Sequence, residues 1–173
     1  MANRSDTGII CAVALLNGLL IATNVGMLSY VVNNILDHTP NLRLVKPNAR
    51  PNAATQYLLI FTASAVLIGA TSVFLGFITS ARRNNSIRAA AFSLSLASII
   101  LYALSIGFGA KQTQLGGEGS VPKAIFALDV VLVVTGTLYA ILLYMGLIHD
   151  GHAGLGTGTA PAGAPHYGGD YKV

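Results

Sequence analysis

The sequence predicts an all-α membrane protein, a four-transmembrane-helix bundle with a mobile C-terminal tail. Four apolar stretches lie at about residues 8–32, 55–78, 87–109 and 124–148. Each is at least as long as the roughly 20 residues with which a helix crosses the hydrocarbon core. Of the 173 residues, 53% are hydrophobic and 9% are charged, whereas a soluble domain carries about 25% charged residues. Because lipid offers no partner to backbone polar groups, each stretch is expected to be helical.

The four spans form one transmembrane domain, residues 1–150, and leave no room for a soluble domain. The remaining segment, residues 151–173, is rich in Gly, Ala and Pro and has no apolar period. Such a segment cannot bury enough surface to offset the entropy lost on ordering, so we expect a disordered tail. The histidines in and beside it match no metal-binding spacing.

The first apolar stretch is predicted to be an uncleaved helix. It runs for about 25 residues, whereas the apolar core of a signal peptide has about 7–15. Asn17 and Asn24 are seven residues apart and therefore share one face of this helix. Cys11 is the single cysteine, so an internal disulfide is excluded.

The second and third stretches contain small residues at helical spacing, which indicates close helix packing. These residues are Ser64, Ser72 and Gly76 in the second stretch, and Ala89, Ser93 and Ala97 in the third. Packing within the bundle is one interpretation of the pattern. A face for a homo-oligomer is the alternative.

The loops indicate the orientation and the class of partner. Arg82, Arg83 and Arg88 crowd the short second loop, and basic residues favour the cytoplasmic side, so we expect both termini in the cytoplasm. The net charge of +4 fits contact with membrane lipids. No basic run alternates with aromatics as in a nucleic-acid groove, and the glycines of the third loop lack the spacing of a phosphate-binding loop.

The fourth stretch contains Asp129, the only acidic residue within a span. It lies roughly 8–9 Å inside the membrane edge at 1.5 Å per residue, where a charge is costly unless it has partners. Asn24, Thr62, Ser64 and Ser105 lie at similar depth, and Lys111 lies just beyond. We predict a polar layer with Lys111 or Asn24 nearest to Asp129. It is either a structural hydrogen-bond cluster or a site for a proton or a polar ligand, with Asp129, Lys111 and Asn24 as candidate ligand-binding residues.

A second, weaker polar layer is expected deeper in the bundle. Its candidate residues are Asn17, Thr71, Ser72, Ser98, Thr135 and Thr137. Hydroxyls of this kind can also bond carbonyls of their own helix. Neither layer has the residues of a catalytic triad, a zinc site or a carboxylate pair, so the sequence predicts no enzyme, no metal and no cofactor.

Two segments resemble one family of membrane proteins. The first is ARRNNSIRAAAFSLSLASIILYALSIGFGAKQTQLGG at residues 81–117, with Arg-Asn-Asn-Ser before an Ala-rich helix start and Ala-Lys-Gln and a Gly pair after it. The second is LLYMGLIHDG at residues 142–151. Both are similar to segments of the AWPM-nineteen-like family, plant plasma-membrane proteins induced by abscisic acid and dehydration.

The resemblance implies a plasma-membrane protein of the abscisic-acid, drought, salt and cold responses and of seed dormancy. Members of the family have been proposed to carry abscisic acid, a small weak acid, into the cell. We therefore expect uptake of abscisic acid. The alternative is a non-transporting tetraspan that acts as an osmotic or stress sensor, a scaffold or a membrane stabiliser.

Overall fold

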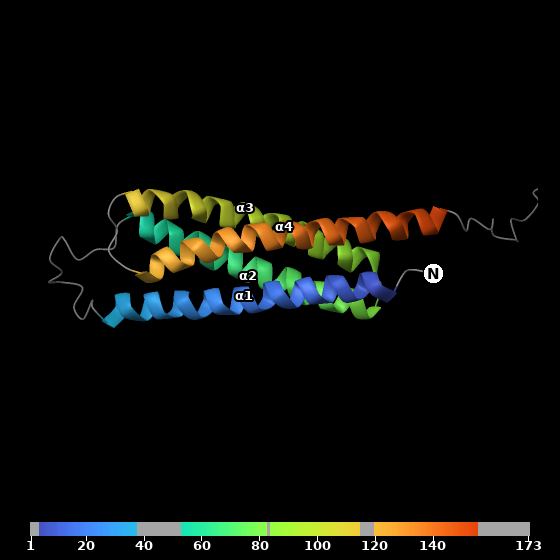
Figure 1. The fold of residues 1–173 in the computed structure, drawn as a ribbon, viewed down its shortest axis with the longest axis horizontal. Coiled ribbons are helices and arrows are strands. Elements are labelled where there is room, and N and C mark those ends of the chain that lie inside the picture. The colour runs from blue at the N-terminus through green and yellow to red at the C-terminus, as the bar shows by residue number, and fades with distance from the viewer. Residues whose placement is uncertain (1–3, 38–52, 83, 115–119, 156–173) are drawn as a thin grey trace, which may run out of the picture.

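The computed structural model describes residues 4–37, 53–82, 84–114 and 120–155, and these residues form four helices. They are α1 (Arg4–Asp37), α2 (Ala53–Arg82), α3 (Asn85–Gln114) and α4 (Ser120–Leu155). All four are long and apolar enough to cross a membrane, so the predicted fold class is confirmed. The helices alternate in direction, and the start of α1, the end of α2 and the end of α4 share one end of the bundle (Figure 1).

Each helix is longer at both ends than the apolar stretch that predicts it. Hydropathy marks only the part of a helix that lies in hydrocarbon, while the helical backbone continues among polar residues. Asn84 starts α3 as its N-cap, because its side-chain Oδ1 accepts the backbone N–H of Ser86 at 3.0 Å. Helix α4 continues to Leu155, and the rest of the predicted tail lies outside the described residues.

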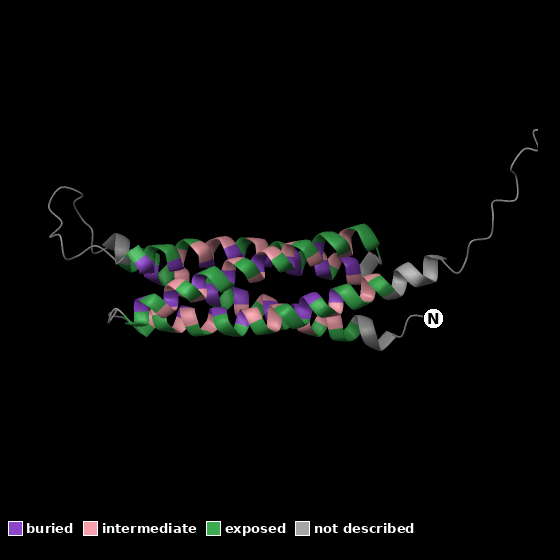
Figure 2. Cartoon of the chain, turned by 90° about the horizontal axis from the view of Figure 1, so that it is seen from above, coloured by how far each residue is buried: buried purple, intermediate pink, exposed green. Residues whose placement is uncertain are grey.

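The bundle is apolar outside, and its interior combines an apolar core with buried polar residues. Leu67 and Val134 are 69% and 65% exposed, whereas Asn24 and Asp129 are 0% exposed. Figure 2 shows the exposed residues along the outer sides of the helices and the buried ones toward the middle. An apolar exterior differs from that of a soluble bundle and suits a protein whose outer surface contacts lipid.

The inward face of each helix repeats every seven residues. The buried residues of α3 are separated alternately by four and three positions: Ala91, Ser95, Ser98, Tyr102, Ser105, Gly109 and Gln112. The same steps connect the buried residues of α2 from Thr55 to Thr79. This spacing is typical of helices packed side by side with a left-handed crossing.

The predicted small-residue stripe of α3 is on the wrong face. Ala89 and Ser93 are exposed, and the buried seam runs through Ala91 and Ser95 instead. Small residues occur on more than one face of this helix, so a spacing of four could not by itself identify the packed face.

Helix α3 packs against α2 and α4, and α1 packs against the same two helices on the opposite side. The α2–α3 contact contains a stack of aromatic rings, in which Tyr57 and Phe61 lie 5.1 and 5.5 Å from Phe108 between ring centroids. Between α2 and α4, the Tyr139 hydroxyl lies where a Cβ on Gly76 would project. A glycine at position 76 is therefore required for α4 to approach α2 so closely.

Arg88 lies inside the third predicted span, close to its beginning. Its guanidinium Nη1 donates to the carbonyl of Gly146 in α4 at 2.9 Å. A long basic side chain near a helix end can cover apolar surface with its stem while its head finds polar atoms. Arg88 thus connects α3 to α4 at the end of the bundle opposite to the Asp129 side.

Candidate functional site

Asp129 lies on the buried seam of α4 and is completely enclosed by protein. Its carboxylate has one partner on each of the other three helices. Asn24 Nδ2 in α1 donates to Oδ1 at 2.8 Å, Thr62 Oγ1 in α2 donates to Oδ2 at 2.7 Å, and Ser105 Oγ in α3 donates to Oδ2 at 2.6 Å. We refer to these four residues as the Asp129 tetrad. Such donors offset the cost of burying a carboxylate away from water.

The tetrad contains a closed triangle of oxygen atoms. Thr62 Oγ1 and Ser105 Oγ lie 2.6 Å apart, and both lie within 2.7 Å of Asp129 Oδ2. The two hydroxyls supply two hydrogens for these three contacts, since each has a single O–H. At most two of the three contacts are therefore hydrogen bonds while the carboxylate is ionised, and a proton on Oδ2 would complete the third. The tetrad is thus chemically able to accept a proton without rearranging its oxygen atoms.

Only one end of the Asn24 side-chain amide, the nitrogen, makes a hydrogen bond. Its Nδ2 binds Asp129, whereas its Oδ1 is buried and has no hydrogen-bond partner among the described residues. An unpaired buried acceptor is unusual in a folded protein.

The structure separates the predicted candidates for ligand binding. It brings Asn24 to Asp129, as predicted. Lys111 is exposed and lies six residues beyond Ser105 in α3, so it is about 9 Å further along the helix axis. The three donors to Asp129 are neutral groups, and Thr62 and Ser105 take the position that the prediction gave to Lys111. A binding role for Asp129, Lys111 and Asn24 stays a prediction.

A second polar layer lies two turns deeper in α1 and α4. Thr135 Oγ1 donates to Asn17 Oδ1 at 2.8 Å, and Asn17 Nδ2 donates to the Thr135 carbonyl at 3.3 Å. Ser72 Oγ donates to the Ala91 carbonyl at 2.7 Å, and the Tyr139 hydroxyl donates to the Ser72 carbonyl at 3.2 Å.

The other predicted members of this layer divide into two groups. Thr71 and Thr137 are exposed and bond carbonyls four residues back in their own helices. Ser98 is buried on the inward face of α3.

Sequence reasoning missed the tyrosines Tyr102 and Tyr139, which are each 2% exposed. The seven-residue repeat could have found them. Tyr102 lies three residues before Ser105, and Tyr139 lies ten residues after Asp129, so both fall on the same seam as the tetrad.

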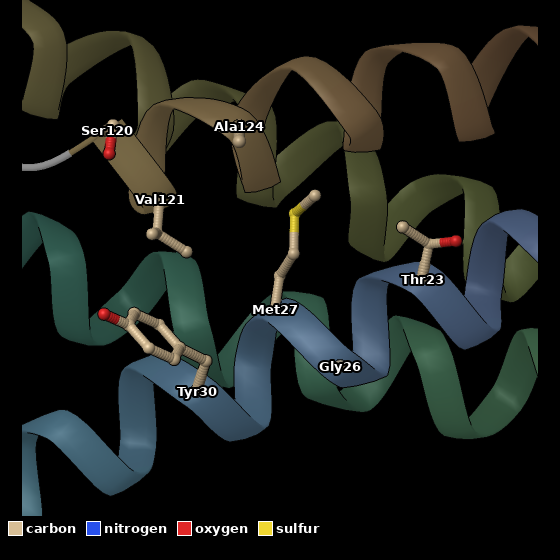
Figure 3. A pocket seen from close by; sticks show the side chains of 7 residues that line it. All are labelled: Thr23, Gly26, Met27, Tyr30, Ser120, Val121 and Ala124. Atoms are coloured by element: carbon tan, nitrogen blue, oxygen red, sulfur yellow. The ribbon is translucent and has the colours of Figure 1, made fainter.

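A cleft of about 540 Å³ opens between α1 and α4 on the Ser120 side of the tetrad. It is lined by Thr23, Gly26, Met27, Tyr30, Ser120, Val121 and Ala124, and we call it the α1–α4 cleft. In Figure 3 the side chain of Met27 extends from α1 toward α4, and Val121 extends from α4 toward α1. The lining is apolar apart from three hydroxyls and contains no charged side chain.

The α1–α4 cleft lies close to the tetrad. Thr23 precedes Asn24, and Ala124 lies five residues before Asp129, or about 7–8 Å along the axis of α4. No group of three His, Cys, Asp or Glu residues that could hold a metal ion occurs in the part of the chain that the structure describes.

Comparisons with known proteins agree with this architecture. The model of the AWPM-19-like family matches residues 15–151, which include most of the bundle. The rice protein named membrane protein PM19L (Oryza sativa subsp. japonica) is 29% identical over 165 residues, which cover 95% of this chain and 88% of the rice protein. No solved structure matches the chain.

Proposed function

Because the chain belongs to the AWPM-19-like family and is a multi-pass plant membrane protein, we propose that it takes up abscisic acid across the plasma membrane. Its setting would be the response to dehydration, salt and cold and the control of seed dormancy. The family resemblance supports the ligand and the setting. The α1–α4 cleft is the structural observation on which the proposed uptake depends.

The α1–α4 cleft suits a small amphipathic weak acid. Its volume of about 540 Å³ is within the range of roughly 300–1,000 Å³ for small-molecule pockets, and such pockets are mostly apolar with a few polar groups. Abscisic acid has an apolar ring and side chain and one carboxyl group. The hydroxyls of Thr23, Tyr30 and Ser120 are the polar groups that could orient it.

The charge of the lining selects the protonation state of the ligand. The lining has no cationic side chain to pair with a carboxylate, and burying an unpaired carboxylate is costly. The neutral acid has no such cost and brings its own O–H donor. The unpaired Oδ1 of Asn24, the residue next to Thr23, is an acceptor of the kind that this donor requires.

Uptake of radiolabelled abscisic acid into liposomes containing the purified protein tests the proposal. Met27→Trp fills the cleft from α1 and should reduce uptake at least fivefold. Met145→Trp is the matched control, because Met145 is 61% exposed on the outside of α4, and it should leave uptake unchanged. Equal uptake in both variants, or no uptake above protein-free liposomes by the wild type, contradicts the proposal.

A second function, as a non-transporting tetraspan that senses stress, scaffolds partners or stabilises the membrane, is favoured by the Asp129 tetrad. The tetrad bonds both oxygens of the carboxylate within the protein, as a purely structural cluster would. The same liposome assay separates the two functions. Binding of labelled abscisic acid without transport would favour a sensor, and neither binding nor transport would favour a scaffold or stabiliser.

The proposed orientation has both termini and the α2–α3 turn in the cytoplasm. Asn84 belongs to the glycosylation sequence Asn84-Asn85-Ser86 and is exposed at the beginning of α3. Expression in a glycosylating system should leave it unmodified, whereas a sequence engineered at residue 48, in the first loop, should be modified. Glycosylation at Asn84 would reverse the orientation.

A further inference from the structure

A second and smaller cavity lies inside the bundle, at the level of the second polar layer that contains Asn17, Ser72 and Tyr139. Its volume is about 20 Å³, and all four helices contribute to its lining. Five of the polar residues that line it are Asn17 from α1, Ser72 from α2, Ser98 and Tyr102 from α3, and Tyr139 from α4.

The cavity begins one helical turn from the tetrad. Ile21 lies three residues before Asn24, Tyr102 three before Ser105, and Leu132 three after Asp129, and each of the three lines the cavity. Three residues of helix correspond to about 4.5 Å. The cavity therefore begins below the tetrad and extends to Asn17, Ser72 and Tyr139 of the second polar layer.

The Tyr102 hydroxyl is the polar group in this layer that lacks a partner. Tyr102 is 2% exposed, and its oxygen is buried without a hydrogen bond to any of the described residues. Leaving a hydroxyl unsatisfied in an apolar environment is unfavourable, and nearly all buried polar groups in folded proteins have a partner. Lipid surrounds the bundle at this depth, so the partner must come from inside.

We propose that this cavity is a binding site for a single water molecule, held by the Tyr102 hydroxyl. A volume of about 20 Å³ exceeds the roughly 10–15 Å³ that one water requires, and a buried water needs two to four polar partners. Ser98 and Ser95, which also line the cavity, can donate or accept. Asn17 Oδ1 accepts from Thr135 and, like other carbonyl oxygens, has a second lone pair.

The water site would join the two polar layers. It lies beside the Asn17–Thr135 and Ser72–Tyr139 contacts, which connect α1 to α4 and α2 to α4, and begins one turn from the tetrad, which connects all four helices. The ligand is water rather than a small organic molecule, because the volume admits little more than one oxygen atom.

Tyr102→Phe distinguishes a hydrated cavity from a dry one by the sign of its effect. If water binds Tyr102, the variant loses a hydrogen bond, and the equilibrium constant for folding should decrease roughly tenfold. If the cavity is dry, the variant removes an unsatisfied hydroxyl, and its stability should equal or exceed that of the wild type, which would overturn the proposal. Reversible unfolding of the full chain in lipid bicelles measures this.

A double-mutant cycle tests whether Tyr102 and Ser98 bind the same water molecule. The effects of Tyr102→Phe and Ser98→Ala should be coupled. The equilibrium constant for folding should decrease less in the double variant than the product of the two single decreases. The matched control pairs Tyr102→Phe with Thr137→Val, because Thr137 is exposed and bonds its own helix, and these two should be independent. Independence of Tyr102 and Ser98 would contradict the shared water.

Direct observation on the wild type does not depend on the folding of any variant. A crystal structure at a resolution that orders internal water should show one density peak within about 3 Å of the Tyr102 oxygen. An empty cavity would overturn the proposal. Unfolding measured in sodium and in choline buffers should give the same stability, whereas stabilisation by sodium would assign the site to a cation instead.

Discussion

The Asp129 tetrad joins all four helices and the α1–α4 cleft lies beside it on two of them, yet the two regions have opposite characters. The tetrad is polar and enclosed, and most of its hydrogen bonds are made within the protein itself. The cleft is apolar, open and without charged side chains. The difference indicates a division of labour, in which the polar residues hold the helices together and the apolar opening remains available to a ligand.

Replacement of Asp129 should have the largest effect on the tetrad. Asp129→Leu leaves the neutral donors of Asn24, Thr62 and Ser105 without their acceptor, and the free energy of unfolding should decrease by about 3–5 kcal/mol, because each unsatisfied group costs about 1–3 kcal/mol. Asp129→Asn keeps the shape of the side chain and one acceptor, so the free energy of unfolding should decrease by only about 1–2 kcal/mol. Reversible unfolding in bicelles measures both changes.

Asp129→Asn also tests whether the tetrad is more than structural. A variant that folds normally but loses the pH dependence of abscisic acid uptake would assign a proton-handling role to Asp129. If Asp129→Leu is as stable as the wild type, the carboxylate does not hold the bundle together, and the comparison between the two regions fails.

Gly76→Ala should have the next largest effect, at a place remote from the cleft. The new methyl group would overlap the Tyr139 hydroxyl, so the Tyr139 side chain must move and its bond to the Ser72 carbonyl is lost. We expect a destabilisation of about 2–3 kcal/mol. Gly107→Ala is the control, since nothing lies within 4 Å of its added Cβ, and it should be neutral or slightly stabilising.

Removal of the cleft hydroxyls should change ligand binding and leave stability nearly intact. Thr23→Val and Ser120→Ala together remove two polar groups of the lining, and binding of abscisic acid should weaken roughly threefold to tenfold. Unfolding should change by less than about 0.5 kcal/mol, as is usual for exposed positions. A large loss of stability without a loss of binding would show that the cleft residues are structural.

Lys111→Ala should have the smallest effect of the series. Lys111 is exposed at the end of α3 and is not among the partners of Asp129, so stability should change by less than about 0.5 kcal/mol. Uptake at neutral pH should remain within twofold, because the cleft is expected to select the neutral acid. A tenfold decrease in uptake would restore the role that the sequence suggested for this lysine.

The sequence was sufficient for the fold class and for one contact of the site. Four long apolar stretches predict four helices, and the family match confirms the resemblance seen in residues 81–117 and 142–151. The Asn24–Asp129 contact was also predictable, because an isolated intramembrane carboxylate requires a donor at its own depth.

The rotation of each helix was harder to predict. Hydropathy indicates where a helix begins and ends but does not distinguish the lipid-facing side when most sides are apolar. For this reason Lys111 was preferred over Thr62 and Ser105, and the wrong face of α3 was chosen for packing. The seven-residue spacing of Ser98 and Ser105, like that of Asn17 and Asn24, was the available signal, since polar residues of a membrane bundle face inward.

The distribution of the tetrad over four helices has a consequence for biosynthesis. Among the four described spans, Asp129 belongs to the fourth to leave the ribosome, and its three donors belong to the three before it. Until α4 enters the bilayer, Asn24, Thr62 and Ser105 have no carboxylate to bind, and α4 alone would expose a charge to lipid. Completion of the tetrad therefore requires all four helices, and a chain that stops before α4 leaves three buried donors without their acceptor.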